Sequence, residues 1–250
     1  MDMSEISLYR KYRPHNFDNL VGQDHVKETL INAIKSDHIA HAYLFTGPRG
    51  TGKTSTARLI AKALNCQNLK DDFEPCNECE LCVDIASGRL IDLIEIDAAS
   101  NRGIDEVRDL KEKINFAPSR SKYKVYIIDE VHMMTKEAFN ALLKTLEEPP
   151  SHAYFILATT EVHKIPETII SRCQRFDFRR INTKALLTRL SFIAQKEGIE
   201  AEQKALEAIS KYADGGLRDA IGLVEQLSAD SKLTHEHVHD MLGISDSSLL

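Results

Sequence analysis

Residues 42–54 read AYLFTGPRGTGKT, and they are the strongest indication of the fold class in the sequence. Its first five residues form an apolar run typical of a buried β-strand, and the other eight match the pattern G-x-x-x-x-G-K-[ST]. A helical pattern follows. Glycines in such a turn let backbone N–H groups curl around phosphates, and the start of the helix adds positive charge. A glycine-rich turn without a ligand is the alternative, but the flanking strand and helix favour a phosphate-binding loop.

Two side chains of this loop have expected roles toward a nucleoside triphosphate. Lys53 is placed to reach the β and γ phosphates, and the Thr54 hydroxyl is placed to bind Mg²⁺. The other residues would surround the phosphates with their backbone. The predicted nucleotide-binding segment comprises Gly47, Pro48, Arg49, Gly50, Thr51, Gly52, Lys53, Thr54 and Ser55.

Strand and helix patterns alternate around the loop. Apolar runs at 90–97, 124–129 and 153–160 indicate strands, and segments 23–35 and 136–148 have helical periodicity. This alternation predicts an α/β domain with a parallel sheet, helices on both faces and ligands at the carboxyl ends of the strands. From about residue 181 only amphipathic helical stretches remain. We expect a nucleotide-binding domain over 1–179, a helical lid over 180–243, and at 244–250 the start of a linker to a further C-terminal region.

The composition is that of an ordinary globular protein and excludes several classes. Hydrophobic residues make up 42% of the 250 residues and charged residues 28%. No apolar run approaches the roughly 20 residues of a membrane span, and the N-terminus lacks the apolar core of a signal peptide, so we expect a cytoplasmic protein without membrane contact. A net charge of −6 argues against coating DNA by bulk electrostatics. Any DNA contact would be local or shared with partners.

A pair of acids ends the strand-like run at 124–129. Asp129 and Glu130 follow apolar residues directly, and burying two carboxylates there is costly without a metal ion or water. Asp129 is placed to hold Mg²⁺, and Glu130 to polarise the water that attacks the γ-phosphate. Alone, such a pair is more often a helix N-cap or a solvated turn. The phosphate-binding loop makes the catalytic interpretation the better one.

A polar insertion at 66–82 contains four of the five cysteines, Cys66, Cys76, Cys79 and Cys82. A reducing cytoplasm disfavours disulfides, and four thiolates at this spacing suit a closed, tetrahedral structural Zn²⁺ site. An iron–sulfur cluster is one alternative, but the ferredoxin pattern needs its fourth Cys downstream and followed by Pro. Free thiols are the other alternative.

These motifs, in this order, resemble the bacterial DNA polymerase III clamp-loader gamma/tau ATPases, a family of the AAA+ class, over essentially the whole chain. The four-cysteine insertion favours the bacterial subunits over the similar small subunits of archaeal and eukaryotic clamp loaders. The resemblance is carried by the phosphate-binding loop, the insertion and the segments YRKYRP (9–14), LVGQ (20–23), EIDAASNRG (95–103), IIDEVHMM (127–134), NALLKTLEEPP (140–150), LATT (157–160), SRC (171–173) and GGLRDA (215–220).

The resemblance implies roles that spacing alone does not assign. Thr160 would sense the γ-phosphate, with Thr159 as the alternative. Arg172 would be an arginine finger that reaches the ATP of a neighbouring subunit, and Arg218 would bring the lid onto the nucleotide of its own subunit. A surface salt bridge is the alternative for each arginine.

Two further groups of contacts are implied by the same resemblance. The residues that would border the adenine are Tyr9, Arg13, Pro14 and Val21. The residues that would contact the backbone of DNA inside a spiral of subunits are Asn101, Arg102 and Arg108. Arg108 lies among acidic residues, so an ion pair on the helix surface is an alternative for it.

The implied fold is an AAA+ P-loop NTPase domain with a helical lid, and the implied protein is an ATPase motor subunit of the DNA polymerase III holoenzyme. It would use ATP, Mg²⁺ and Zn²⁺ and work with other loader subunits to load the sliding clamp on primed DNA. An inactive scaffold subunit of the delta prime type is the alternative, against which the intact Lys53, Thr54, Asp129 and Glu130 count. Another P-loop ATPase or a kinase would leave Arg172 and the lid unexplained.

Overall fold

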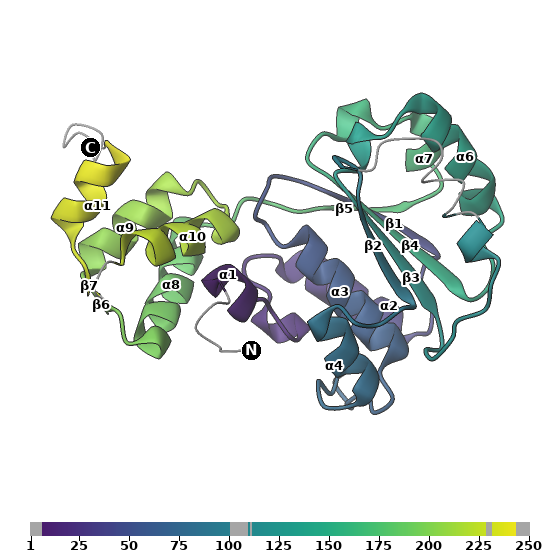
Figure 1. Cartoon of the computed structure of the whole chain (residues 1–250), viewed down its shortest axis with the longest axis horizontal. Coiled ribbons are helices and arrows are strands. Elements are labelled where there is room, and N and C mark those ends of the chain that lie inside the picture. Colours follow the sequence, from purple (N-terminus) through teal and green to yellow (C-terminus); the bar gives the residue numbers. More distant parts are fainter. Residues whose placement is uncertain (1–6, 101–109, 111, 229–231, 244–250) are drawn as a thin grey trace.

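The computed structural model describes residues 7–100, 110, 112–228 and 232–243, and it shows an α/β domain beside a group of helices (Figure 1). The α/β domain contains a five-stranded sheet of order β2-β3-β4-β1-β5 in which every neighbouring pair is parallel. The phosphate-binding loop follows the strand β1, which lies inside the sheet. The strands are β1 (Ala42–Thr46), β2 (Leu93–Asp97), β3 (Lys124–Asp129), β4 (Ala153–Thr159) and β5 (Gln174–Asp177).

Helices cover both faces of this sheet, as Figure 1 shows. Successive side chains of a strand point to opposite faces, so Tyr43 and Phe45 of β1 join one hydrophobic cluster and Ala42 and Leu44 join the other. The first face is covered by α2 (Asp24–Lys35), α3 (Lys53–Asn65) and α4 (Glu80–Ser87), and the second by α6 (Lys136–Glu147) and α7 (Glu167–Ile170). The short 3₁₀ helices are η2 (Phe17–Asn19), η3 (Val131–Met133) and η4 (Val162–Lys164).

The predicted α/β architecture is confirmed, and the structure adds the edge strand β5. Only Phe176 of its four residues is buried. A short strand with three exposed positions has no apolar run, so hydrophobic periodicity does not predict it. Its backbone still pairs with β1 along the register from Tyr43–Gln174 to Thr46–Asp177.

The second part of the chain consists of α8 (Thr183–Glu197), α9 (Gln203–Tyr212), α10 (Leu217–Leu227) and α11 (His235–Leu242) around their own hydrophobic cluster. Side chains such as Leu190, Ile209 and Val224 are fully buried there. The structure also contains a two-stranded parallel sheet of β6 (Glu200–Ala201) and β7 (Lys232–Leu233). Strands of two residues are too short to show a period in the sequence, so the prediction contained helices only.

The N-terminal helix α1 (Leu8–Lys11) packs against the lid, as Figure 1 shows. The backbone N–H of Leu8 donates to the Glu225 carboxylate at 3.1 Å, and Lys11 pairs with Glu197 at 2.8 Å. A few residues later, Phe17 is fully buried in the cluster of the α/β domain. The N-terminal segment therefore joins the lid to the α/β domain, in addition to the connection between β5 and α8.

No helix among the described residues combines the length and the apolar character needed to cross a bilayer.

Candidate active site and metal centre

The parallel register brings the candidate catalytic residues to one edge of the sheet. Thr46 pairs with Thr159, and Asp97 pairs with Asp129, so these strands end at the same level. Glu130 and Thr160 come directly after two of these ends. The carboxyl edge therefore collects the loop that follows β1 and the polar residues that follow β3 and β4.

The phosphate-binding loop has a backbone that two glycines make possible. Gly47 has φ 138°, and a Cβ atom there would lie 2.3 Å from the carbonyl oxygen of Phe178. Gly50 has φ 75°, and a Cβ atom there would lie 3.1 Å from the Cα atom of Gly216 in the lid. The Gly50 carbonyl accepts a hydrogen bond of 3.0 Å from the Leu217 N–H. The loop is thus in direct contact with both neighbouring segments, and side chains larger than hydrogen would separate them.

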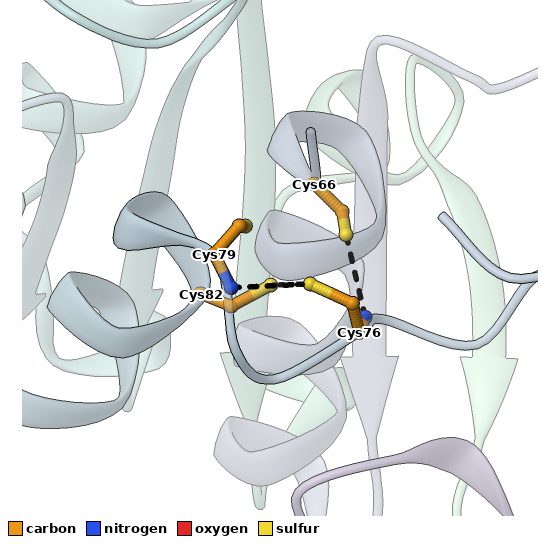
Figure 2. A group of neighbouring side chains, drawn as sticks. All are labelled: Cys66, Cys76, Cys79 and Cys82. Carbon is orange, nitrogen blue, oxygen red and sulfur yellow. Dashed lines mark hydrogen bonds between the residues drawn. The ribbon is translucent and has the colours of Figure 1, made fainter. Parts of the chain in front are cut away.

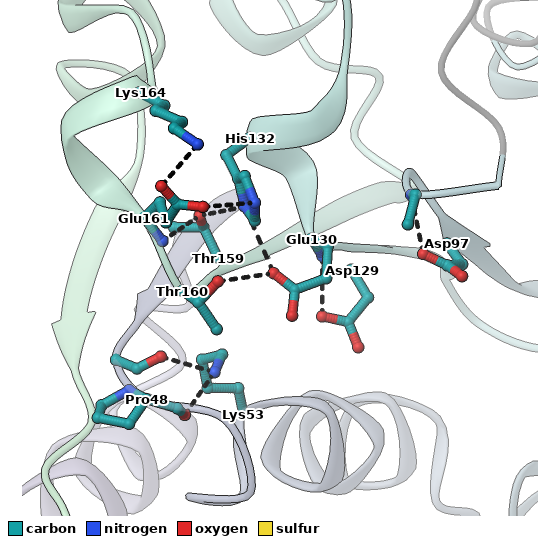
Figure 3. Close-up of polar contacts among 12 residues, drawn as sticks. Pro48, Lys53, Asp97, Asp129, Glu130, His132, Thr159, Thr160, Glu161 and Lys164 are labelled. Atoms are coloured by element: carbon teal, nitrogen blue, oxygen red, sulfur yellow. Dashed lines mark hydrogen bonds and ion pairs between the residues drawn. The ribbon is translucent and has the colours of Figure 1, made fainter.

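Lys53 is buried and lies inside the loop. Its Nζ donates to the carbonyl oxygens of Gly47 and Pro48, each at 2.8 Å (Figure 3). Burial lowers the pKa of Lys53, while the nearby Glu130 and Asp129 act in the opposite direction. The ammonium group is therefore held where the loop would receive phosphates.

Thr54 and Asp129 form the contact that a magnesium site requires. The Thr54 hydroxyl donates to Oδ2 of Asp129 at 2.7 Å, although 75 residues separate them in the sequence. Hydroxyl and carboxylate oxygens are ligands that Mg²⁺ accepts. Both residues line the same cavity as the phosphate-binding loop, so their oxygens fit the ion.

The Glu130 carboxylate contacts two side chains, Thr160 and His132 (Figure 3). The Thr160 hydroxyl donates to Oε2 of Glu130 at 3.1 Å, and Nδ1 of His132 lies 3.3 Å from the same oxygen. Thr159 does not point to Glu130 in this way: its side chain is fully buried, and its hydroxyl contacts Nδ1 of His132 at 3.0 Å. The structure thus brings Thr160 to the candidate catalytic glutamate.

His132 is a site residue that the sequence analysis did not identify. Its side chain is only 6% exposed, and its Nε2 lies 3.3 Å from Oε1 of Glu161. The imidazole therefore joins the glutamate after β3 to the segment after β4 (Figure 3). His132 lies within the segment IIDEVHMM (127–134), but a histidine two residues after an acidic pair belongs to no periodic pattern that would indicate its role.

A cavity of about 610 Å³ lies between the phosphate-binding loop, the N-terminal segment and the lid. Arg218 lines this cavity. All the residues predicted to border the adenine line it as well, namely Tyr9, Arg13, Pro14 and Val21. The guanidinium of Arg218 lies 4.7 Å from the centre of the Tyr9 ring, so the lid and α1 meet in the cavity wall. Lining residues that the sequence did not indicate include Glu95, Asp97, Ile181, Arg189 and Ile221.

Arg172 lies outside this cavity, just after α7. Its guanidinium pairs with Glu147 at the end of α6 and donates to the Thr168 carbonyl at 2.6 Å. The side chain is 31% exposed. Within the part of the chain that the structure describes, Arg172 therefore does not contact the nucleotide site of its own subunit. The predicted DNA contacts Asn101, Arg102 and Arg108 lie outside the described residues.

The four cysteines of the insertion converge on one point, as Figure 2 shows. Their sulfur atoms all lie within 4.8 Å of one another, and those of Cys76 and Cys82 are 4.0 Å apart. A tetrahedral zinc–thiolate site with Zn–S bonds of about 2.3 Å places its sulfurs about 3.8 Å apart. Cys66 follows α3, Cys79 caps α4 and Cys82 lies within α4. The four residues can therefore hold a tetrahedral metal ion.

Backbone N–H groups point at two of the sulfurs. The N–H of Cys79 donates to Sγ of Cys76 at 3.3 Å, and the N–H of Cys76 donates to Sγ of Cys66 at 3.3 Å. Burial opposes ionisation of Cys76, but hydrogen bonds from the N–H groups of Cys79 and Glu78 and from the side chains of Cys66 and Cys79 together lower the pKa of this thiol to about 6. Burial raises the pKa of Cys82. The donor set suits thiolate ligands, and a bound cation would stabilise the buried Cys82 thiolate.

Two family models match the chain. One, described as "DNA polymerase III, delta subunit", matches residues 22–182, and the other, described as "DNA polymerase III clamp loader subunit, ATPase lid domain", matches residues 186–231. The fold is similar to that of the Holliday junction branch migration motor RuvB of Thermotoga maritima, with a TM-score of 0.66, 21% identity, and coverage of 95% of this chain and 75% of that one. At this identity the likeness shows a P-loop ATPase fold alone.

Curated relatives match over almost the whole chain. DNA polymerase III subunit tau of Bacillus subtilis is 55% identical over 248 residues, 99% of this chain and 43% of the relative. The tau subunit of Escherichia coli is 47% identical over 246 residues, 98% of this chain and 38% of the relative. The chain thus spans less than half the length of these relatives. Both family models describe subunits of DNA polymerase III, and the relatives that match almost the whole chain are tau subunits. The chain therefore belongs to the gamma/tau family of DNA polymerase III clamp-loader subunits.

Proposed function

We propose that this chain is the ATP-hydrolysing motor subunit of a bacterial DNA polymerase III clamp loader, which acts in the cytoplasm to load the sliding clamp on primed DNA. The observation that carries the proposal is the convergence of Lys53, Thr54, Asp129 and Glu130 at one edge of the sheet, with Thr54 and Asp129 2.7 Å apart. A subunit that only held the complex together would not need these four groups. Family membership supplies the replication context.

Each residue of this edge has a part in the proposed reaction. Lys53 would move from the loop carbonyls to the β and γ phosphates, and Glu130 would accept a hydrogen bond from the attacking water. Thr160, whose hydroxyl donates to Glu130, would sense whether a γ-phosphate is present. Thr54 and Asp129 would hold Mg²⁺, which neutralises charge on the phosphates when bound.

The lid would close the nucleotide cavity from the other side. Arg218 lines the cavity, and the backbone N–H of Leu217 already reaches Gly50. We propose residues 1–179 as the nucleotide-binding domain and residues 180–243 as the lid that moves relative to it. The helix α1 falls within the first range, but it packs on the lid and would move with it. Tyr9, Arg13, Pro14 and Val21 would then border the adenine between them.

The proposed partners are the other loader subunits, the clamp and primed DNA. Arg172 lies away from its own cavity, which supports a role toward a neighbouring subunit's ATP. The contacts to DNA proposed for Asn101, Arg102 and Arg108 rest on the resemblance alone. The four-cysteine centre is proposed to hold Zn²⁺ for a structural purpose, because all four ligands are protein thiols and none is left for a substrate.

The test of the proposal separates nucleotide binding from hydrolysis. Lys53→Ala is expected to abolish tight ATP binding, because the phosphates lose the cation inside the loop. Glu130→Gln is expected to bind ATP normally and to slow hydrolysis by at least about 100-fold, because the water loses its acceptor. Equilibrium titration and single-turnover hydrolysis measure the two quantities. Unchanged ATP affinity in the first variant, or unchanged hydrolysis in the second, would refute the proposed site.

An inactive scaffold subunit is the second candidate, because one matching family model is described as a delta subunit. Reconstitution with the other loader subunits distinguishes the two. A motor subunit is expected to hydrolyse ATP faster when clamp and primed DNA are added. A scaffold would leave the turnover of the complex unchanged when Glu130 is replaced by Gln.

A further inference from the structure

A second cavity, of about 340 Å³, lies beside the nucleotide cavity, between the N-terminal segment, α3 and α4. Its walls contain five basic side chains and, among the described residues, no carboxylate. This is unusual for a chain whose net charge is −6. The basic residues of this second cavity are Arg10, Arg13, His15, Arg58 and Lys62.

The positive charge of the second cavity is poorly compensated. Arg58 pairs with Glu95 at 2.6 Å, but Glu95 lines the neighbouring nucleotide cavity instead. The Nε of Arg58 is buried and has no hydrogen-bond partner within the described part of the chain. A buried donor without a partner costs free energy, so the Nε–H of Arg58 would be stabilised by a bound hydrogen-bond acceptor.

The basic groups are close enough to repel one another. Burial lowers the pKa of Arg13, and the neighbouring Arg58 lowers it further, with Glu95 opposing. Burial likewise lowers the pKa of His15, and Lys62 adds to the effect. An anion between these groups would relieve the repulsion.

Lys62 contributes less than the arginines, because it has another contact. Its Nζ donates to Oδ1 of Asn77 at 2.7 Å, within the four-cysteine insertion. Arg10 and Arg58 also have one such contact each, with the Tyr9 hydroxyl and with Glu95, but a guanidinium has five N–H donors and keeps others for a ligand. The main donors of the cavity are therefore the guanidinium groups of Arg10, Arg13 and Arg58. Planar guanidinium groups match phosphate oxygens in paired hydrogen bonds, and a few hundred Å³ is enough for a small ligand.

We propose that the second cavity is a binding site for a small phosphate-bearing anion, either a single phosphate or a diphosphate group. The site goes beyond the proposed function and does not depend on ATP hydrolysis. It would be linked to the nucleotide cavity in two ways: Arg10, Arg13 and Pro14 line both, and the ion pair between Arg58 and Glu95 spans the two walls.

The experiment must exclude binding of the anion at the phosphate loop, so it uses the full chain carrying Lys53→Ala. Inorganic pyrophosphate and orthophosphate are titrated separately by calorimetry. One anion per chain is expected. Tighter binding of pyrophosphate would identify a diphosphate as the preferred group, and equal affinity would identify a single phosphate. No saturable binding of either anion would overturn the proposal.

Arg58→Gln in the same background is expected to weaken binding by about tenfold or more, because one charged hydrogen-bond donor is lost. The matched control is Arg89→Gln, which removes the same charge next to the cavity from a side chain that is 69% exposed and does not line it. The control is expected to keep full affinity. Arg10→Gln, at an exposed position, repeats the test if Arg58→Gln fails to fold. An equal loss in the control and in the cavity variants would show general charge attraction and refute the site.

Discussion

At the scale of single residues, the side chains around Glu130 set the position of its carboxylate. Glu130 has a left-handed backbone, φ 48°, which a non-glycine residue adopts at some cost. The carboxylate lies next to Thr160 and the buried His132, which in turn reaches Glu161. His132 therefore links the proposed catalytic base to the segment after β4, and we interpret it as a positioning residue.

Replacing His132 with Gln tests this interpretation. The variant is expected to lower the turnover number by about 10-fold to 100-fold, because a displaced carboxylate no longer aligns the water, while ATP affinity stays the same. Single-turnover hydrolysis and a nucleotide titration are the measurements. The matched control is His163→Gln, because His163 faces the same Glu161 at 3.6 Å but is 74% exposed. Equal effects of the two substitutions, or a loss of affinity in the first alone, would contradict a positioning role.

Some residues of the candidate active site can be predicted from the sequence, and others cannot. Spacing was enough to single out Lys53, Thr54, Asp129 and Glu130, because a motif fixes them relative to strands that an apolar run reveals. His132 could not be assigned in this way, since its contacts come from residues 2, 27 and 29 positions away. Contacts of this kind depend on how β3 and β4 pair, and only the fold gives that register.

At the scale of elements, the four-cysteine insertion connects α3 to α4 through its ligands. Cys66 follows the last turn of α3, and Cys79 and Cys82 come from the first turn of α4. Leu81 and Ile85 on α4 are buried in the same cluster as Leu59 and Ile60 on α3. A bound ion would therefore hold α4 against the helix that begins at the phosphate-binding loop.

Metal analysis of protein purified without chelator is expected to find about one zinc ion per chain. Cys79→Ser is expected to lose the metal and to lower the melting temperature by more than about 5 °C, because a structural metal stabilises only the folded state. Cys173→Ser, outside the cluster, is the control and should retain the metal. Iron in the wild-type protein, or an unchanged melting temperature after metal loss, would contradict a structural zinc site.

Elements differ in how clearly the sequence reveals them. The strands β1, β3 and β4 consist mostly of buried apolar residues, so their runs stand out in the sequence. By contrast, β5 has one buried residue, and β6 and β7 have two residues each. The latter strands exist because a neighbouring strand offers backbone hydrogen bonds. Tertiary pairing of this kind leaves no trace in hydrophobic periodicity.

At the scale of the whole molecule, Arg172 lies outside the nucleotide cavity of its own chain. Within the described residues Arg172 pairs with Glu147 and contacts no residue of the nucleotide cavity. If it serves a neighbour, an isolated chain is expected to hydrolyse ATP slowly, since an arginine finger is worth roughly 10³ to 10⁵ in rate in comparable systems.

The corresponding test uses loaders that carry one Arg172→Ala subunit at a defined position. That subunit is expected to bind ATP normally, while hydrolysis falls at the adjacent wild-type site. Lys53→Ala subunits silence the other sites so that each turnover can be assigned. Loss of hydrolysis at the variant's own site would show that Arg172 acts within its subunit.

The chain passes between the α/β domain and the lid at two places. The first place is the segment between α1 and the buried Phe17, where α1 is attached to the lid through Glu225. The second place lies near Arg180. At the second place the N–H of Arg179 donates to Gln23 on one side, and the N–H of Ile181 donates to the Gly215 carbonyl on the other. A body attached at two points keeps one free rotation, about the line that joins them. We therefore expect the lid to rotate about this fixed axis. A small change at the γ-phosphate would then move the surface that the lid presents to a neighbouring subunit in one defined direction.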